Sequence, residues 1–220
     1  MQYSDNYRHK GLRKNLVDGL RKKGIRDEKI LEAIGTIPRH FFLDQGFDEW
    51  AYKDVAFPIE ADQTISQPFT VAMQTTLLEI KPKEKILEIG TGSGYQACVL
   101  SFLGTKVYTI ERQETLFLKT SEFLPSIGFG NIRTLFGDGY KGAPRFAPFD
   151  KILITAGAPV IPQALIDQLK VGGIMVIPLG EGEVQEMIRI IKVGENEVRQ
   201  EKHGSYRFVP LLKGTNKFKK

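Results

Sequence analysis

Gly90, Gly92 and Gly94 stand at every second position directly after an apolar run, residues 86–89, in the segment KILEIGTGSGYQA. A short apolar run bounded by turn residues is typical of a buried parallel strand, and glycine permits unusual backbone angles and the close approach of a ligand. The segment therefore predicts a strand, a tight loop and the start of a helix. Open α/β sheets bind nucleotides at such loops, although a purely structural turn is the alternative.

Two further positions narrow the choice of ligand. A dinucleotide-binding loop requires a third glycine where this chain has Tyr95, so the sequence does not indicate recognition of a pyrophosphate. Glu111 lies 21 residues after Gly90 and follows a second apolar run, residues 107–110. A carboxylate at this place accepts hydrogen bonds from both ribose hydroxyls. The pattern favours an adenosine-bearing cofactor without phosphates, and we expect S-adenosylmethionine.

Two polar residues near the predicted loops each have a structural and a functional interpretation. Ser66, in the segment QTISQP, can cap the helix that begins at Pro68, or it can direct its hydroxyl at a ligand. Asp138, between two glycines at the end of a predicted strand, can form a turn or hydrogen-bond the amino group of adenine. The local pattern leaves both choices open.

Length and composition predict one soluble domain. The chain has 220 residues, of which 41% are hydrophobic. No apolar run approaches the ~20 residues that span a bilayer, and the start MQYSDNYRHK lacks the apolar part of a signal peptide. We therefore expect a cytoplasmic protein with no membrane partner. The single cysteine, Cys98, permits no internal disulfide and is interpreted as a core residue.

Charge and histidine content argue against two other kinds of site. The formal net charge is +5, but the excess lies in the runs RHKGLRKN, RKKG and KGTNKFKK, which are typical of solvated helix faces and tails. We therefore expect no nucleic-acid partner. His9, His40 and His203 are interpreted as surface residues, and no acidic or histidine cluster has the spacing of a metal site.

The remaining pattern describes the elements that position these residues. An amphipathic helix over residues 7–24 and a second helix, capped by Asp27 and ending before Pro38, form an N-terminal cover. The expected strands cover residues 86–89, 107–110, 132–136, 149–155 and 174–179, and the expected helices cover residues 95–103, 113–123 and 162–169. Such alternation implies a doubly wound, mostly parallel α/β sheet. Residues 184–191 and 197–208 predict antiparallel strands added at one edge.

These motifs together resemble those of the protein-L-isoaspartate(D-aspartate) O-methyltransferase family, which uses S-adenosylmethionine, over nearly the whole chain. The matching segments are GIRDEKILEAIGTIPRHFF, AYKD, FPI, QTISQP with FTVAM, KILEIGTGSGYQA, VYTIER, GDG, FDKILITAGAP, LKVGGIMVIPLG and RFVPL. Several of them occur widely among methyltransferases, whereas TISQP joined to ILEIGTGSGYQA is the specific combination. The resemblance implies a Rossmann-like methyltransferase fold. We divide the chain into residues 1–81, with the N-terminal helices and the substrate loop, and residues 82–220, with the cofactor site and the C-terminal hairpin.

The resemblance also implies a role for each matching residue. Ser66 matches the active-site serine of the family and, together with Thr64, is expected to bind the substrate. Glu111 matches the ribose carboxylate, and Asp138 with Gly139 matches the adenine contact. The other expected cofactor-binding residues are Glu88, Gly90, Thr91, Gly92, Ser93 and Gly94.

The sequence departs from the family pattern just before QTISQP. Family members commonly have glycines there, whereas this chain has residues 60–62, Glu-Ala-Asp, so the conformation of the entry loop is less defined by the resemblance. We assign no role to the residues from Leu212 onward, which follow RFVPL.

The implied reaction is methyl transfer to the free α-carboxylate of L-isoaspartyl residues in damaged proteins and peptides, which starts repair through a succinimide. That carboxylate is ionised at neutral pH because its pKa is near ~4, so the reaction requires no general base. We also expect no metal. Ser66 would orient the carboxylate by a hydrogen bond, while the site aligns the reactants and excludes water.

Three alternatives stay open. A methyltransferase of nucleic-acid bases usually carries D/N-P-P-Y/F where the corresponding strand here ends in TAGAP. A non-catalytic Rossmann-like binding module leaves the TISQP segment unexplained. A small-molecule O-methyltransferase commonly requires a metal or a histidine base, for which the sequence offers no clear candidates.

Overall fold

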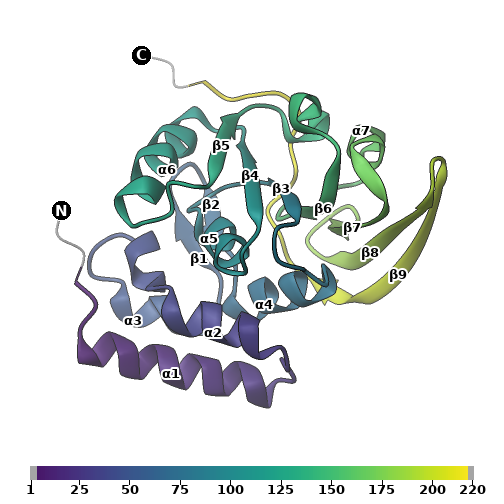
Figure 1. The fold of residues 1–220 in the computed structure, drawn as a ribbon. Helices are drawn as coiled ribbons and strands as arrows, with labels where there is room; N and C mark the ends of the chain where they lie inside the picture. The colour runs from purple at the N-terminus through teal and green to yellow at the C-terminus, as the bar shows by residue number, and fades with distance from the viewer. Residues whose placement is uncertain (1–3, 218–220) are drawn as a thin grey trace.

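A seven-stranded sheet forms the centre of the fold (Figure 1), described here from a computed structural model for residues 4–217. Its strands are β3 (Lys85–Ile89), β4 (Lys106–Glu111), β5 (Arg133–Phe136), β6 (Phe149–Ile154), β7 (Leu169–Leu179), β8 (Gln185–Gly194) and β9 (Glu197–Tyr206). Their order is β5-β4-β3-β6-β7-β8-β9. The first five along this order are parallel, whereas β8 and β9 are antiparallel additions, as predicted. From β3 the chain continues to β4 and β5 on one side, whereas β6 and β7 lie on the other side of β3. The loop after β3 therefore lies at the switch point, where the strand order reverses and open α/β sheets bind ligands.

Helices cover both faces of this sheet (Figure 1). They are α1 (Tyr7–Lys22), α2 (Glu28–Thr36), α3 (Asp48–Ala51), α4 (Pro68–Leu77), α5 (Tyr95–Phe102), α6 (Glu114–Ser126) and α7 (Gln163–Asp167), with 3-10 turns η1 (Arg39–Phe42), η2 (Gly139–Lys141) and η3 (Pro144–Phe146). Across the described residues 4–217, no helix combines the length and apolar character that crossing a membrane requires.

The predicted N-terminal cover is present as α1 and α2, which lie side by side below the sheet in Figure 1. The Asp27 carboxylate accepts hydrogen bonds from Lys29 N at 2.9 Å and Ile30 N at 3.3 Å, so its predicted role as N-cap is confirmed. Leu16 and Leu20 are buried in a common apolar cluster with α2. Apolar burial on one face of each helix therefore attaches the cover to the rest of the fold.

The predicted alternation of strands and helices is confirmed, with one large difference at the boundaries. β7 begins at Leu169, five positions before the predicted start at Ile174, and it includes Gly172 and Gly173. Leu169 pairs with Phe149 on β6, and the register then shifts before Ile174 pairs with Lys151. The bulge lets the strand continue through a glycine pair that, in the sequence alone, indicates a break.

Cys98 is fully buried on α5, and burial raises the pKa of its thiol, so the interpretation as a core residue is confirmed.

A short hairpin before α4 was not predicted. Strands β1 (Phe57–Ile59) and β2 (Gln63–Ile65) pair antiparallel, where the sequence suggested only a loop. The turn between them uses Ala61 at φ 59° and Asp62 at φ 55°, a left-handed conformation that glycine adopts more readily. Ala61 and Asp62, which stand where family members commonly have glycines, therefore adopt a backbone conformation that glycine favours.

We expect Ala61→Gly to raise the free energy of unfolding by about 0.5–1 kcal/mol, because the left-handed region costs a residue with a Cβ about 1–2 kcal/mol and glycine entropy offsets part of the gain. Urea unfolding of both proteins measures the difference. The matched control is Ala164→Gly in the helix α7, which should lower stability by about 0.5–1 kcal/mol. A loss of stability at both positions would contradict the prediction.

Candidate functional site

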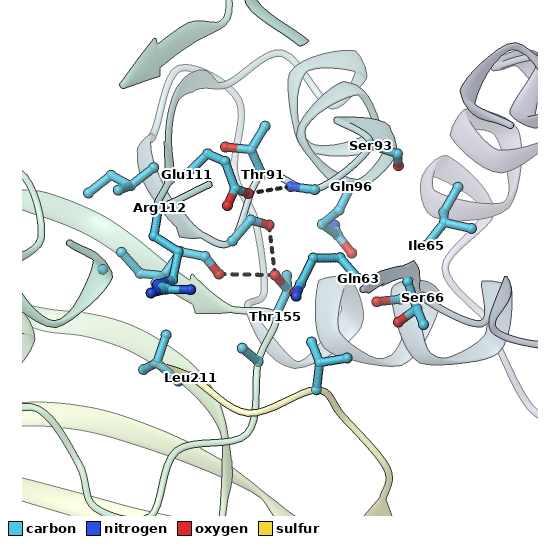
Figure 2. Close-up of a pocket in the computed structure, with 18 of the residues that line it drawn as sticks. Gln63, Ile65, Ser66, Thr91, Ser93, Gln96, Glu111, Arg112, Thr155 and Leu211 are labelled. Atoms are coloured by element: carbon cyan, nitrogen blue, oxygen red, sulfur yellow. Dashed lines mark hydrogen bonds between the residues drawn. The ribbon is translucent and has the colours of Figure 1, made fainter. Parts of the chain in front are cut away.

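A cavity opens at the carboxyl ends of the central parallel strands (Figure 2). It contains about 750 Å³ of space between protein atoms, part of it open to solvent. Its lining comes from residues 63–66, 71, 89–93, 95–96, 110–112, 139, 155–156 and 209–212. Open α/β sheets bind their ligands at this edge, so the cavity has the position expected of a cofactor site.

The glycine loop has a geometry that other residues would disturb. Gly90 has φ 96°, and a Cβ added to it would lie 2.6 Å from Thr155 Oγ1. The Thr155 hydroxyl lies 3.0 Å from the Ile89 carbonyl and 2.8 Å from the Gly90 carbonyl, so it ties the end of β6 to the loop. Gly94 has φ 85°, and its Cβ would lie 2.8 Å from Leu124 Cδ2. The loop is therefore a tight structural turn whose exposed side lines the cavity.

Glu111 holds the glycine loop from the end of β4. Its Oε2 accepts a hydrogen bond from Gly92 N at 2.9 Å, drawn as a dashed line in Figure 2, and its Oε1 accepts one from Gln113 N at 2.9 Å. Burial raises the pKa of the carboxyl group, and these backbone N–H groups oppose that rise. A carboxylate has about four acceptor positions, so two are left for ribose hydroxyls. The two free acceptor positions of Glu111 therefore suit the ribose hydroxyls of the expected cofactor.

Ser66 lines the same cavity but does not cap α4, so that structural interpretation was wrong. The N-cap residue is Gln67, which makes no side-chain capping bond. Asp54 instead accepts a hydrogen bond from Phe69 N at 2.8 Å and so satisfies the helix start from a distant part of the chain. Within residues 4–217 the Ser66 hydroxyl has no hydrogen-bond partner and is left available to a ligand.

Arg39 fixes the backbone of the serine. Its Nη2 donates to the Ser66 carbonyl at 2.8 Å, and its guanidinium carbon lies 4.7 Å from the centre of the Tyr95 ring. The side chain is almost completely buried, and this burial lowers its pKa to about 10. Because Tyr95 directly follows the glycine loop, Arg39 connects the serine segment to the loop.

Asp138 and Gly139 lie differently with respect to the cavity. Asp138 Oδ1 accepts a hydrogen bond from Tyr140 N at 3.0 Å and caps η2, so the predicted turn is confirmed. Gly139 lines the cavity, whereas Asp138 is not part of its lining. The adenine contact of both residues stays a prediction.

Glu88 lies beneath the loop and does not line the cavity. Thr109 Oγ1 donates to Glu88 Oε2 at 2.5 Å and lies 2.7 Å from Thr91 Oγ1, while Glu88 Oε1 has no partner in the described part of the chain. Complete burial raises the pKa of Glu88 to about 8. The side chain is thus protonated at neutral pH, and its predicted role in cofactor binding stays a prediction.

We expect Glu88 to make the fold less stable as pH rises. The folded protein keeps a proton on Glu88 that the unfolded chain loses near its ordinary pKa. The free energy of unfolding should therefore fall by about 1 kcal/mol per pH unit between about pH 5 and about pH 8. Urea unfolding at about pH 6 and about pH 8 should show this fall in the wild type and a smaller one in Glu88→Gln. Equal falls in the two proteins would show that Glu88 is not the group responsible.

Several cavity residues were missed by the sequence analysis. Gln63, Gln96 and Thr155 line the cavity and lie within the segments QTISQP, KILEIGTGSGYQA and FDKILITAGAP, whose pattern alone assigned them no role. Residues 209–212 lie in the segment after β9 (yellow in Figure 1), which crosses the carboxyl edge of the sheet. Leu211 N donates to Gly157 O at 2.7 Å and holds the segment there. This segment has no periodic pattern that would have predicted its position.

The prediction that the histidines lie on the surface was wrong for two of the three. His9 and His40 are 6% and 8% exposed, and their ring centres are 3.8 Å apart. With Asp5 they form a group whose ligand atoms lie within 4.8 Å of one another. However, Asp5 is paired with Arg13, and the His40 nitrogens contact Tyr52 Oη and Ser4 O. The His9 nitrogens contact Asn6 N and Asp48 Oδ2, so each member of the group already has a protein partner. The group does not line the cavity at the glycine loop.

Comparison with known proteins identifies the family. The sequence model described as protein-L-isoaspartate(D-aspartate) O-methyltransferase (PCMT) matches residues 11–216. The chain belongs to the protein-L-isoaspartate O-methyltransferase family. The predicted resemblance is confirmed, and with it the assignment as an S-adenosylmethionine-dependent protein carboxyl methyltransferase.

Individual members of the protein-L-isoaspartate O-methyltransferase family match along their whole length. The enzymes of Christiangramia forsetii and Flavobacterium johnsoniae are 57% and 56% identical, and each alignment covers 96% of this chain and 99% of the relative. A solved protein-L-isoaspartate O-methyltransferase superposes with a TM-score of 0.82 at 27% identity, covering 90% of this chain and 65% of the other. A Plasmodium falciparum structure in complex with S-adenosyl-L-homocysteine gives 0.80 at 23% identity, covering 92% and 99% of the two chains, and supports the fold. The predicted fold class is confirmed.

Membership of the protein-L-isoaspartate O-methyltransferase family also confirms the predicted reaction and cofactor. The chain transfers a methyl group from S-adenosylmethionine to the free carboxylate of L-isoaspartyl residues, the first step of repair through a succinimide.

Proposed function

We propose that Ser66 binds the isoaspartyl carboxylate at one side of the cavity at the glycine loop while Glu111 binds the cofactor ribose at the other. The observation that supports this division is the placement of the two side chains, which line one cavity and lie on opposite sides of it in Figure 2. The methyl acceptor and the methyl donor would then meet between them.

The roles of the residues follow from the chemistry of the substrate. S-adenosylmethionine, when bound, supplies an electrophilic methyl group on a sulfonium centre. The isoaspartyl carboxylate is ionised at neutral pH because its pKa is near ~4, so the protein supplies orientation rather than a base. The Ser66 hydroxyl donates a hydrogen bond to one carboxylate oxygen and leaves the other directed at the methyl group. Arg39 keeps the serine backbone in place through the Ser66 carbonyl.

Exclusion of water is the second task of the site. Residues 209–212 form one wall of the cavity and are held by the hydrogen bond from Leu211 N to Gly157 O. After methylation, the backbone nitrogen that follows the isoaspartyl residue displaces methanol and closes the succinimide. This later step requires no group of the enzyme.

A second cavity adjoins the first and gives a path for the peptide. Thr64, Ser66, Thr155 and Val209 line both cavities, and the second extends along residues 205–208. Chain segments on either side of the isoaspartyl residue would lie there, with Thr64 as a contact. The proposed partners are therefore isoaspartyl-containing proteins and peptides, not nucleic acids or membranes, and the proposed location is the cytoplasm.

The proposed division of the chain follows the same arrangement. Residues 1–81 carry the N-terminal helices and the serine segment, and residues 82–220 carry the glycine loop, Glu111 and the C-terminal hairpin. The two parts form one unit with the reaction site between them.

The test is methyl transfer from labelled S-adenosylmethionine to two peptides that differ only in one isoaspartyl or aspartyl residue. Base-labile methylation with release of methanol should be confined to the isoaspartyl peptide. If neither peptide is methylated while the cofactor still binds, the proposed substrate is wrong, and nucleic acid is the next substrate to test. Methylation of both peptides would show that the cavity does not select the isoaspartyl carboxylate.

A further inference from the structure

Gln96 presents an acceptor oxygen to the cavity at the glycine loop. The residue lies in the first turn of α5, is 7% exposed and lines the cavity. Its Nε2 donates to Thr75 Oγ1 at 3.0 Å, and Thr75 Oγ1 donates to the Val71 carbonyl at 2.7 Å. Because the only hydroxyl proton of Thr75 is used by Val71, Thr75 can only accept from Gln96. The amide is therefore held with its nitrogen toward Thr75 and its oxygen away from it.

The Gln96 oxygen has no hydrogen-bond partner among residues 4–217. Figure 2 shows the amide in the middle of the pocket, between the labelled side chains of Glu111 and Ser66, with its oxygen directed into the pocket. Buried polar atoms in folded proteins are nearly always paired, and each exception requires an explanation. A fixed, buried and unpaired acceptor in a ligand cavity points to a hydrogen-bond donor on the ligand.

The ligands of this site offer few donors at that position. The substrate carboxylate is an acceptor only, and the ribose hydroxyls are assigned to Glu111. The α-ammonium group of the methionine part of the cofactor is a charged donor, and the methionine part must lie between the ribose and the serine side of the site. We propose that Gln96 Oε1 accepts a hydrogen bond from this α-ammonium group. The proposal rests on the cofactor assignment made above.

A neutral acceptor is suited to this place. A carboxylate at position 96 would also bind an ammonium group, but it would repel the anionic substrate that Ser66 is proposed to orient. The amide attracts the cofactor without this repulsion. Gln96 can therefore bind the cofactor without repelling the substrate carboxylate.

The test compares two ligands by isothermal titration calorimetry. S-adenosylhomocysteine carries the amino-acid part, whereas 5′-methylthioadenosine has the adenosine and the thioether without it. In Gln96→Leu, we expect the Kd of S-adenosylhomocysteine to rise about 10- to 100-fold, because a hydrogen bond to a charged group is lost. The Kd of 5′-methylthioadenosine should stay unchanged, since that ligand has no ammonium group.

Gln74→Leu is the matched control. Gln74 is fully buried, donates from Nε2 to the Ile154 carbonyl at 2.9 Å and also has an unpaired Oε1, but it does not line the cavity. This variant should leave the ratio of the two Kd values unchanged. A further variant, Gln96→Glu, should retain S-adenosylhomocysteine binding and raise KM for the isoaspartyl peptide.

Two results would overturn the proposal. One is an equal change, or no change, in both Kd values of Gln96→Leu. The other is a rise in KM for the peptide alone, which would assign the Gln96 oxygen to a backbone N–H of the substrate. Failure of the wild-type protein to bind S-adenosylhomocysteine would instead contradict the cofactor assignment.

Discussion

Ser66→Ala is expected to lower kcat/KM for an isoaspartyl peptide by about 10- to 100-fold, because a hydrogen bond that orients the charged carboxylate is lost. The Ser66 hydroxyl has no other partner in residues 4–217, so the substitution removes the contact to the substrate and little else. Steady-state assays with the isoaspartyl peptide measure the loss. The affinity for S-adenosylhomocysteine, measured by calorimetry, should not change.

A matched variant distinguishes this role from a structural one. Ser66→Thr keeps a hydroxyl and should retain more activity than Ser66→Ala, because the donor is preserved. The circular dichroism spectrum and urea midpoint of Ser66→Ala should equal those of the wild type, since Asp54 and not Ser66 caps α4. Full activity of Ser66→Ala would remove the serine from the mechanism.

Glu111→Ala is expected to raise the Kd of S-adenosylhomocysteine by about 10²- to 10³-fold, because hydrogen bonds from two hydroxyls to a charged acceptor are lost. The substitution also leaves the N–H groups of Gly92 and Gln113 without their acceptor, because each donates to a Glu111 carboxylate oxygen at 2.9 Å. The glycine loop therefore loses its anchor together with the ribose contact. Calorimetry with S-adenosylhomocysteine and with adenosine measures the effect.

Adenosine distinguishes the roles of Glu111 and Gln96. Adenosine contains the ribose, so Glu111→Ala should weaken its binding in parallel with that of S-adenosylhomocysteine. Glu122→Ala, an exposed carboxylate on α6 outside the cavity, is the control and should change neither Kd. An unchanged affinity in Glu111→Ala would mean that the ribose binds elsewhere.

Much of this fold could be predicted because its signals are local. The apolar run before Gly90 predicted β3 and the loop, and Asp27 predicted the start of α2, since strand periodicity, glycine and capping residues act over a few neighbouring positions. Glu111 was identified by its spacing from the glycine loop, and the structure places both at one cavity. These features depend on residues that lie within one or two consecutive elements of the chain.

The features that were missed depend on distant contacts. The N–H of Phe69 is satisfied by Asp54, so the helix cap could not be read from the residues beside Pro68. β1 and β2 have three residues each, too few for a periodic pattern, and their turn uses residues other than glycine. His9 and His40 are buried because η1 packs against α1, a contact that the polar character of histidine does not reveal.

The late position of residues 209–212 in the sequence affects how the protein folds during translation. They form a wall of the cavity, and in the sequence they follow all strands of the central sheet. A ribosome therefore releases the whole sheet before it releases the segment that completes the cofactor site. Ligand binding can stabilise only a chain that already has its site, so bound cofactor cannot assist the early stages of folding during translation. Burial of the apolar side chains on the two faces of the sheet must drive these stages without it.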